Sequence, residues 1–364
     1  MARALALARK GLGETSPNPM VGCVVVKNGR AIAESYHRKA GSDHAEVAAL
    51  RRAGRAAKGA TVYVTLEPCA HHGRTPPCAP LLAAAGVRRA VVAMVDPNPA
   101  VNGRGLRAMR AAGIAVSVGV GEAEARALNE RFVVGARGGR PFVLLKAAAT
   151  LDGRIATASR RSRWITSPRQ RAAARALRRL HDGVAVGIGT VLADDPMLLP
   201  APAVHRPFVR VVFDSRLRLP LGSRLVRSAR RSPVWVVTRE RDARRRARLE
   251  GRGVTVIEVA GPGSGIPVRA ALRVLRRRGL WSLMVEGGSE LLGSFLAARA
   301  FDQVALFRAP LLLGGRGSLS AFGGPDPRSL SAAVRMMPVL DPLLPRGVAR
   351  ELVEIWRPLA ARKA

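Results

Sequence analysis

Cysteines, aromatic residues and long apolar runs are all scarce in this sequence, and each scarcity excludes a class of protein. Three cysteines in 364 residues are too few, and odd in number, for a scaffold held together by disulfides. Aromatic residues make up only 4% of the chain, so few rings are available to stack on nucleotide bases. No apolar run approaches the ~18 residues that span a membrane, so we expect no transmembrane helix and no membrane partner.

The length and composition favour a folded protein with two domains. At ~100–200 residues per domain, 364 residues suggest two domains, and a hydrophobic content of 48% is ample for two cores. Met1–Gly13 is basic and rich in alanine and leucine, but it is too short for a signal peptide with an apolar stretch and a cleavage site. We therefore expect a cytoplasmic location.

The net charge is the strongest compositional feature. The chain carries 61 basic and 25 acidic residues, a formal charge of +36 that points first toward nucleic acid. Arginine accounts for 55 of the basic residues and is spread along the chain, with short clusters at Arg244–Arg246 and Arg276–Arg278. No basic run is interleaved with aromatic residues, which a nucleic-acid groove would use for stacking. The charge therefore favours solvated arginine-rich surfaces over a nucleic-acid partner.

The first 139 residues alternate between strand-like and helix-like segments. The apolar run Val21–Lys27 is followed by the turn signal Asn28-Gly29, which predicts a hairpin with Ala31–Tyr36. Strands that alternate with helices indicate a largely parallel sheet covered by helices. The further segments that we expect are strands at Thr61–Leu66, Val87–Val95 and Ile114–Val118, and helices at His44–Arg55, Pro77–Ala85 and Gly103–Ala112.

A stretch rich in glycine and arginine, residues 135–141, is the best candidate for a linker between two α/β domains, which we place at residues 1–139 and 140–364. The same alternation resumes beyond it, whereas Pro338–Pro358 is broken by prolines and gives no clear pattern. We expect strands at Phe142–Ala147, Val184–Ile188, Val209–Asp214, Val234–Thr238, Val254–Val259, Ser282–Val285 and Gln303–Ala309, and helices at Pro168–His181, Val268–Arg277 and Ser289–Phe295.

The first domain contains a set of metal-ligand residues. His44 opens a predicted helix, Cys69 follows a predicted strand, and Cys78 stands at the start of the next helix. One imidazole and two thiolates suit Zn²⁺ with a fourth position open to water, and helix N-termini favour the thiolate form. Glu46 lies two residues after His44, where a carboxylate can take a proton from that water and pass it to a leaving amine.

His-x-Glu followed by Pro-Cys and a further Cys is the signature of zinc deaminases. A capping histidine, a surface glutamate and two buried cysteines would explain each part alone, but not all parts in this order. We interpret Cys23 as a core residue of its strand. His71 and His72, which lie between the two cysteine ligands, could compete as metal ligands, but we interpret them as loop or substrate contacts.

Eight residues separate the two cysteines, whereas polynucleotide and cytidine deaminases have two. Around them the chain resembles the bifunctional riboflavin-biosynthesis deaminase/reductase family. The stretches that carry the resemblance are Ser16-Pro17-Asn18-Pro19 with Val21-Gly22-Cys23, Gly41 through His44-Ala45-Glu46-Val47, Thr65-Leu66-Glu67-Pro68-Cys69 through His71-His72-Gly73-Arg74-Thr75-Pro76-Pro77-Cys78, and Asp96-Pro97-Asn98-Pro99.

By this resemblance the first domain has a cytidine-deaminase-like three-layer α/β/α fold. It would hydrolytically deaminate 2,5-diamino-6-ribosylamino-4(3H)-pyrimidinone 5′-phosphate. His44, Cys69 and Cys78 match the zinc ligands, Glu46 the proton shuttle, and Asn18 a residue that holds the pyrimidine edge.

The second domain shows a strand ending in Glu286-Gly287-Gly288, where bare backbone N–H groups at the start of a helix could bind a cofactor phosphate. The Rossmann fingerprint is absent, because the pair Gly187-x-Gly189 is followed by Leu192 where the third glycine belongs. Together with Lys146–Arg154, Ser162–Thr166 and Val186–Pro196, this segment resembles the reductase half of the same family. That half has a dihydrofolate-reductase-like α/β fold and uses NADPH to reduce the ribosyl side chain to ribityl.

Carried over by motif position, two groups of residues would line the reductase site. Those expected to face NADPH are Ala148, Trp164, Thr166, Thr190, Asp194, Ser215, Gly288, Ser289, Glu290, Leu291, Leu292, Gly293 and Ser294. Of these, Trp164 could equally be a large core residue. Those expected to face the substrate are Ser162, Arg178, Leu198 and Glu286.

The second domain departs from the family pattern in two places. The family usually continues Asp-Asp-Pro with Leu-Thr-x-Arg, but residues 197–202 contain no basic residue, so either a phosphate contact is missing or Arg206 supplies it. Arg160-Arg161 stands where Gly-Glu is common. Both departures concern the substrate site of the reductase rather than its fold.

Two other functions stay open at this stage. One is a zinc deaminase acting on tRNA or a nucleobase, with a non-catalytic basic second domain. The other is a zinc-stabilised basic module that binds nucleic acid. The eight-residue spacing argues against the first, and Glu46 beside the metal is unexplained by the second. We expect a small phosphorylated pyrimidine as substrate and a homo-oligomeric protein whose size the sequence does not give.

Overall fold

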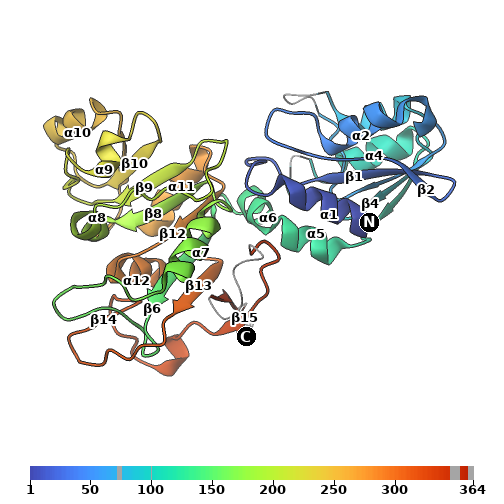
Figure 1. The fold of residues 1–364 in the computed structure, drawn as a ribbon. Coiled ribbons are helices and arrows are strands. Elements are labelled where there is room, and N and C mark those ends of the chain that lie inside the picture. The colour runs from blue at the N-terminus through green and yellow to red at the C-terminus, as the bar shows by residue number, and fades with distance from the viewer. Residues whose placement is uncertain (72–75, 100, 345–352, 360–364) are drawn as a thin grey trace. The chain divides into compact units, whose positions relative to one another are not determined.

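The computed structural model describes residues 1–71, 76–99, 101–344 and 353–359, and the chain divides into two compact units, Met1–Gly139 and Arg140–Ala364 (Figure 1). The longest helix within the described residues has 11 residues. None of the described helices combines the length and the hydropathy that crossing a membrane requires.

A mixed sheet forms the centre of the first unit. Asn28 and Gly29 both have positive φ, 50° and 74°, as a two-residue hairpin turn requires, so the predicted hairpin is confirmed. The first strand runs antiparallel to both of its neighbours, and only the remaining pairs are parallel, so the sheet is less parallel than expected. The described strands, in the spatial order β2-β1-β3-β4-β5, are β1 (Gly22–Lys27), β2 (Arg30–Tyr36), β3 (Thr61–Val64), β4 (Arg89–Val92) and β5 (Ala115–Val118).

Helices cover both faces of this sheet and make three layers. Figure 1 shows α2 and α4 on one face of the sheet and α1 and α5 on the other. Cys23 and Val25 of β1 belong to a core cluster with residues of α2, α3 and α4, while Val24 between them packs against the N-terminal helix. The N-terminal helix and the two helices after β5 were not predicted. The described helices are α1 (Ala2–Ala8), α2 (Ala45–Ala53), α3 (Cys78–Ala84), α4 (Arg104–Ala111), α5 (Glu122–Leu128) and α6 (Glu130–Arg137), with 3₁₀ turns at Arg9–Gly11 and Gly54–Ala57.

A larger sheet forms the centre of the second unit. Its strands are parallel except at one end, where β13 pairs antiparallel with β16 and β16 with β15. Within the described residues the order is β11-β10-β9-β8-β12-β6-β13-β16-β15, and β7 and β14 form a separate pair. The strands are β6 (Phe142–Ala149), β7 (Arg154–Ala156), β8 (Gly183–Gly187), β9 (Val209–Phe213), β10 (Val234–Thr238), β11 (Thr255–Glu258), β12 (Ser282–Val285), β13 (Gln303–Arg308), β14 (Leu319–Ser320), β15 (Met336–Pro338) and β16 (Glu354–Pro358).

This second sheet is also covered on both faces. Val211 and Phe213 of β9 face a core shared with α11 and α12, whereas Val212 faces a core shared with α8, α9 and α10. Helix α8 begins where the expected strand Val184–Ile188 was to end, and α9 and α10 were not predicted. The helices are α7 (Pro168–Arg178), α8 (Ile188–Asp194), α9 (Arg224–Arg227), α10 (Ala243–Glu250), α11 (Val268–Arg277) and α12 (Ser289–Ala297), with a 3₁₀ turn at Leu330–Ala332.

Substitution of Gly183 tests how closely β8 packs against β9 in the second sheet. A Cβ at this position would lie 2.5 Å from the backbone oxygen of Val209 on the neighbouring strand, so Gly183→Ala should lower the free energy of unfolding by about 1–3 kcal/mol. Gly222→Ala is the control, because a Cβ at that position would have no other atom within 4 Å. Urea denaturation of both variants measures the difference, and equal midpoints would contradict the packing argument.

Candidate active sites

The three predicted zinc ligands meet at one edge of the first sheet. β1 runs antiparallel to β2 and to β3, so β2 and β3 are parallel to each other and their carboxyl ends lie at the same edge. The segment after β2 brings His44 to the N-cap position of α2, and the segment after β3 carries Cys69. Cys78 is the first residue of α3. The strand directions therefore bring together ligands separated by up to 34 positions in the sequence.

The geometry of these side chains fits a zinc ion. Nδ1 of His44 lies 3.2 Å from Sγ of Cys78 and 3.6 Å from Sγ of Cys69. All three ligand atoms lie within 4.8 Å of one another. Tetrahedral zinc with bonds of ~2.0–2.3 Å separates its ligand atoms by roughly 3.5 Å, so one nitrogen and two sulfurs can hold the ion with little rearrangement. His44 makes no capping bond with its side chain, which excludes the simple capping role.

The two cysteines share a hydrogen bond that leaves Cys69 as the thiolate and Cys78 as the thiol. A hydrogen bond from the Cys78 thiol to the Cys69 sulfur lowers the pKa of Cys69 to about 4, and His44 contributes in the same direction. The same hydrogen bond raises the pKa of Cys78, as does its burial. The backbone N–H of Cys78 also donates to the Cys69 sulfur, at 3.4 Å. A metal binding to this pair therefore meets one ready thiolate and must displace one proton.

Glu46 is buried beside the ligands. It lies in the first turn of α2 with 4% of its surface exposed, and its carboxyl group is within hydrogen-bonding reach of Cys78. Burial raises the pKa of Glu46, although the nearby His44 opposes this shift. A raised pKa makes a carboxylate a stronger base, which suits a group that takes up and returns a proton.

Glu67 is a buried carboxylate to which the sequence analysis assigned no separate role. Its two oxygens accept N–H bonds of 2.8–3.3 Å from four backbone groups, those of Asp96, Gly103, Gly105 and Leu106. A Cβ on Gly105 would lie 1.9 Å from the carbonyl oxygen of Pro68, so the start of α4 packs directly on the segment that carries Cys69. Glu67 thereby fixes the position of Cys69. The only feature of the sequence that could have indicated this role is that Glu67 is a charged residue between an apolar strand and a proline.

Asn18 is oriented by a histidine that sequence reasoning missed. The Asp43 carbonyl can only accept, so Nδ1 of His37 donates to it at 3.0 Å. Burial lowers the pKa of His37, and with Nδ1 as the donor Nε2 accepts from the Asn18 amide nitrogen at 3.1 Å. The His37 ring also lies edge-on to the His44 ring, with centroids 5.5 Å apart. Asn18 is thus tied to the ligand cluster with its amide nitrogen directed at His37.

The other candidates of the first unit lie outside the ligand cluster. Cys23 is fully buried in β1 and belongs to the core, as predicted. His71 is exposed and is not part of the group of potential ligands found among the described residues. His72 lies outside the described residues.

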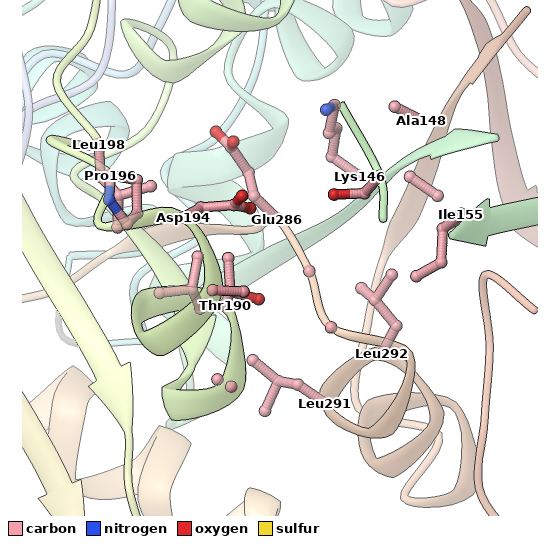
Figure 2. Close-up of a pocket in the computed structure, with 18 of the residues that line it drawn as sticks. Lys146, Ala148, Ile155, Thr190, Asp194, Pro196, Leu198, Glu286, Leu291 and Leu292 are labelled. Atoms are coloured by element: carbon pink, nitrogen blue, oxygen red, sulfur yellow. The ribbon is translucent and has the colours of Figure 1, made fainter. Parts of the chain in front are cut away.

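The second unit contains a cavity of about 1440 Å³ at the carboxyl ends of its parallel strands. Figure 2 shows its walls: Thr190 and Asp194 on α8, Leu291 and Leu292 on α12, and Glu286 in the segment after β12. All four residues expected to face substrate line this cavity, and so do all of those expected to face NADPH except Gly293. The lining members are Ala148, Ser162, Trp164, Thr166, Arg178, Thr190, Asp194, Leu198, Ser215, Glu286, Gly288, Ser289, Glu290, Leu291, Leu292 and Ser294.

Gly293 has a packing role instead. A Cβ at this position would lie 2.0 Å from the carbonyl oxygen of Gly323, so α12 can pack against that segment only with glycine. The start of the same helix is open to the cavity. Gly287 and Gly288 have φ of 135° and 79°, and no side chain caps the helix. Its first N–H groups are therefore available to a phosphate.

Trp164 is a wall residue of the cavity and not a core residue, since 67% of its surface is exposed. The guanidinium of Arg171 lies 4.3 Å from the centre of its ring, and that of Arg163 lies 5.6 Å away. Arg163 also pairs with Asp194 at 3.0 Å. The exposed indole is held by cations rather than by packing.

Glu286 forms the central ion pair of this cavity. Arg178 donates Nε and Nη2 to its two oxygens at 2.5 and 2.8 Å. Burial alone would raise the pKa of Glu286, but the charge of Arg178 and these bonds hold it below its usual value. Lys146 of β6 lies near the pair, and burial lowers the pKa of its ammonium group. Sequence reasoning quoted Lys146 within a motif but gave it no role.

Arg206 does not take the place of the missing basic residue. Its guanidinium pairs with Asp182 at 3.2 Å and donates to the carbonyl oxygens of Arg179 and His181. It is not among the residues that line the cavity. That alternative in the sequence analysis is therefore wrong, because Arg206 is used to stabilise the segment between α7 and β8.

Each half of the chain matches a known protein family. Residues 1–94 match the cytidine and deoxycytidylate deaminase zinc-binding region, and residues 141–339 match the RibD C-terminal domain. Riboflavin biosynthesis protein RibD of Aquifex aeolicus is 44% identical over 325 residues, which cover 89% of each chain. RibD of Escherichia coli is 42% identical over 328 residues, covering 86% of this chain and 88% of the relative.

The chain belongs to the RibD family. A solved RibD of Acinetobacter baumannii superposes with a TM-score of 0.87 at 37% identity, covering 99% of this chain and 98% of that one. A Thermotoga maritima structure, described as a diaminohydroxyphosphoribosylaminopyrimidine deaminase/5-amino-6-(5-phosphoribosylamino)uracil reductase, gives 0.83 at 36% identity, with coverages of 99% and 97%. The family resemblance and the fold class expected from the sequence are confirmed.

Cys69→Ser tests the zinc site of this RibD family member. Removing a thiolate ligand should reduce the bound zinc from about one ion per chain to a small fraction of that. Cys23→Ala is the control and should keep its zinc, because Cys23 lies in the core. Atomic absorption on both purified variants gives the comparison. Unchanged zinc in Cys69→Ser would show that the ligand set is wrong.

Proposed function

We propose that this chain is a bifunctional enzyme of riboflavin biosynthesis. The first unit deaminates 2,5-diamino-6-ribosylamino-4(3H)-pyrimidinone 5′-phosphate, and the second reduces the ribosyl side chain of the product to ribityl. The observation that carries the proposal is the presence of both sites in one chain. A His-Cys-Cys cluster has a buried glutamate beside it, and a large cavity is lined by nearly all the expected reductase residues.

In the first unit we assign His44, Cys69 and Cys78 as zinc ligands and Glu46 as the acid/base. Zinc, when bound, acts as a Lewis acid that makes water a better nucleophile. The buried carboxylate of Glu46 takes a proton from the attacking water and returns one to the leaving ammonia, which its raised pKa suits. The oriented amide of Asn18 holds the pyrimidine edge.

In the second unit NADPH supplies the hydride, and the chain supplies position and charge. We assign the cofactor to the walls formed by α8, by the open N-terminus of α12 and by Trp164, and the substrate to Ser162, Arg178, Leu198 and Glu286. Arg178 holds the carboxylate of Glu286 at a fixed place in the cavity. Glu286 is thereby positioned to bind a polar group of the substrate.

Two further parts of the proposal concern the protein as a whole. The described cysteines form no disulfide, which supports a reducing compartment such as the cytoplasm. Three consecutive leucines of the second unit, Leu311, Leu312 and Leu313, are 47%, 77% and 40% exposed, which supports burial of this apolar stretch in a homo-oligomer.

Glu46→Gln separates chemistry from metal binding. The variant should keep its zinc but release ammonia roughly 10²–10⁴-fold more slowly, because the amide cannot shuttle a proton. Glu124→Gln, an exposed change on α5 in the same unit, should leave the rate unchanged. A coupled ammonia assay measures both. Near-normal turnover by Glu46→Gln would remove the assigned role.

Incubation with the diamino pyrimidinone phosphate tests both halves together. Without NADPH we expect only the deaminated product, about one mass unit heavier, because an amino group is replaced by oxygen. With NADPH that product should gain two hydrogens, in proportion to the NADPH consumed. Mass spectrometry and absorbance at the NADPH band follow the two steps. Deamination without any NADPH consumption would contradict the proposed role of the second unit.

A further inference from the structure

The cavity of the second unit has more positive than negative side chains in its walls. Its acidic members are Asp194, Glu286 and Glu290, and two of these are already paired with arginines. The basic members are Lys146, Arg160, Arg163, Arg171, Arg175, Arg178, Arg218 and Arg224. This excess favours an anionic ligand, and a phosphate group matches the planar donors of arginine.

Three of these arginines lie along one face of α7. Arg171, Arg175 and Arg178 are spaced four and three residues apart, so they stand one above the other on the helix, and all three line the cavity. Arg171 and Arg178 both have partners within the structure. Arg171 donates to the Thr166 carbonyl and lies over the ring of Trp164. Arg178 is bound to Glu286 and to the carbonyl of Leu199, at 2.8 Å.

The middle member has no such partner. Arg175 is exposed, and its guanidinium makes no hydrogen bond or ion pair with any of the residues that the structure describes. Its backbone places it against the segment that follows α8, because Ala201 donates its N–H to the Arg175 carbonyl at 3.3 Å. Residues 197–201 of that segment line the same cavity and contain no basic side chain. Arg175 is therefore the unneutralised cation on this wall.

We propose that Arg175 binds the 5′-phosphate of the pyrimidine substrate, together with the remaining N–H groups of Arg178. This inference rests on the proposed reductase function of the second unit. Two phosphate sources could enter the cavity, the substrate and the cofactor. The location of Arg175 distinguishes them, because it lies beside Arg178 on α7 and its carbonyl accepts from Ala201 in the segment that carries Leu198. Figure 2 shows Leu198 on the opposite side of the pocket from Leu291 and Leu292 of α12. The open helix N-terminus there offers the cofactor its own phosphate site.

The experiment compares three full-length variants in NADPH oxidation. Arg175→Ala removes the cation, Arg175→Lys keeps the charge without the planar fork, and Arg169→Ala is the matched control. Arg169 lies exposed on the same helix but outside the lining of the cavity. Each variant is assayed with the deaminated phosphate substrate and with the same compound after removal of its phosphate. The Kd for NADPH is measured separately by fluorescence, and thermal melting confirms that the variants fold.

With the phosphorylated substrate, Arg175→Ala should raise KM by about 10- to 100-fold and leave kcat nearly unchanged. The phosphate is remote from the reacting carbon, so its binding is the same in the ground state and the transition state. Arg175→Lys should recover part of the loss. With the dephosphorylated compound, Arg175→Ala and Arg169→Ala should have equal KM values, and the Kd for NADPH should be the same in all variants.

Three results would overturn the inference. One is a KM of Arg175→Ala within twofold of the Arg169→Ala value with the phosphorylated substrate. A second is an equal rise with both compounds, which would show a structural effect. A third is a higher Kd for NADPH with no change in KM, which would assign the arginine to a cofactor phosphate.

A binding measurement distinguishes failure of this inference from failure of the proposed function. Calorimetry of the full chain with ribose 5-phosphate needs no turnover, and Arg175→Ala should weaken binding at least tenfold relative to Arg169→Ala. Equal binding would overturn the inference. A wild-type chain that binds ribose 5-phosphate through Arg175 but never consumes NADPH would instead overturn the proposed reductase.

Discussion

The direction of the strands is the constraint on which both candidate sites depend. β2 and β3 are parallel to each other only because β1 lies between them and runs antiparallel to both. The segments with His44 and Cys69 therefore leave the same edge of the sheet. In the second unit β8, β9 and β12 are parallel, and the segments after them converge on one cavity. Reversing one strand would move its functional side chains to the opposite edge.

Helix N-termini complete both sites. His44 stands at the start of α2 and Cys78 at the start of α3, where the backbone N–H of Cys78 donates to the thiolate of Cys69. Gly288 opens α12 with bare N–H groups facing the cavity. The first unit uses these helix ends for metal ligands and the second uses one for an anion. The same electrostatic property thus contributes to two different kinds of chemistry.

The large positive charge is divided among several structural roles. Arg210 is fully buried in β9, where burial lowers its pKa to about 10 and the oxygens of Ser228 and Ser232 accept its hydrogen bonds. Arg206 pairs with Asp182 between α7 and β8, and Arg178 pairs with Glu286. The clusters at Arg244–Arg246 and Arg276–Arg278 lie on α10 and at the end of α11. The excess of arginine is therefore mostly a property of exposed surfaces and helix ends, with a few members inside the second unit.

The sequence alone determined the ligand types, the buried strands and the hairpin turn, because these depend on residue chemistry and local spacing. It could not supply the partners of Glu67 or the link from His37 to Asn18, since the bonded groups are 19 to 39 positions apart. The sequence also could not show that Trp164 is exposed or that Arg206 pairs with Asp182. Only tertiary structure decided them, because hydrogen bonding and exposure depend on which distant segments pack together, and a sequence pattern records only the neighbours along the chain.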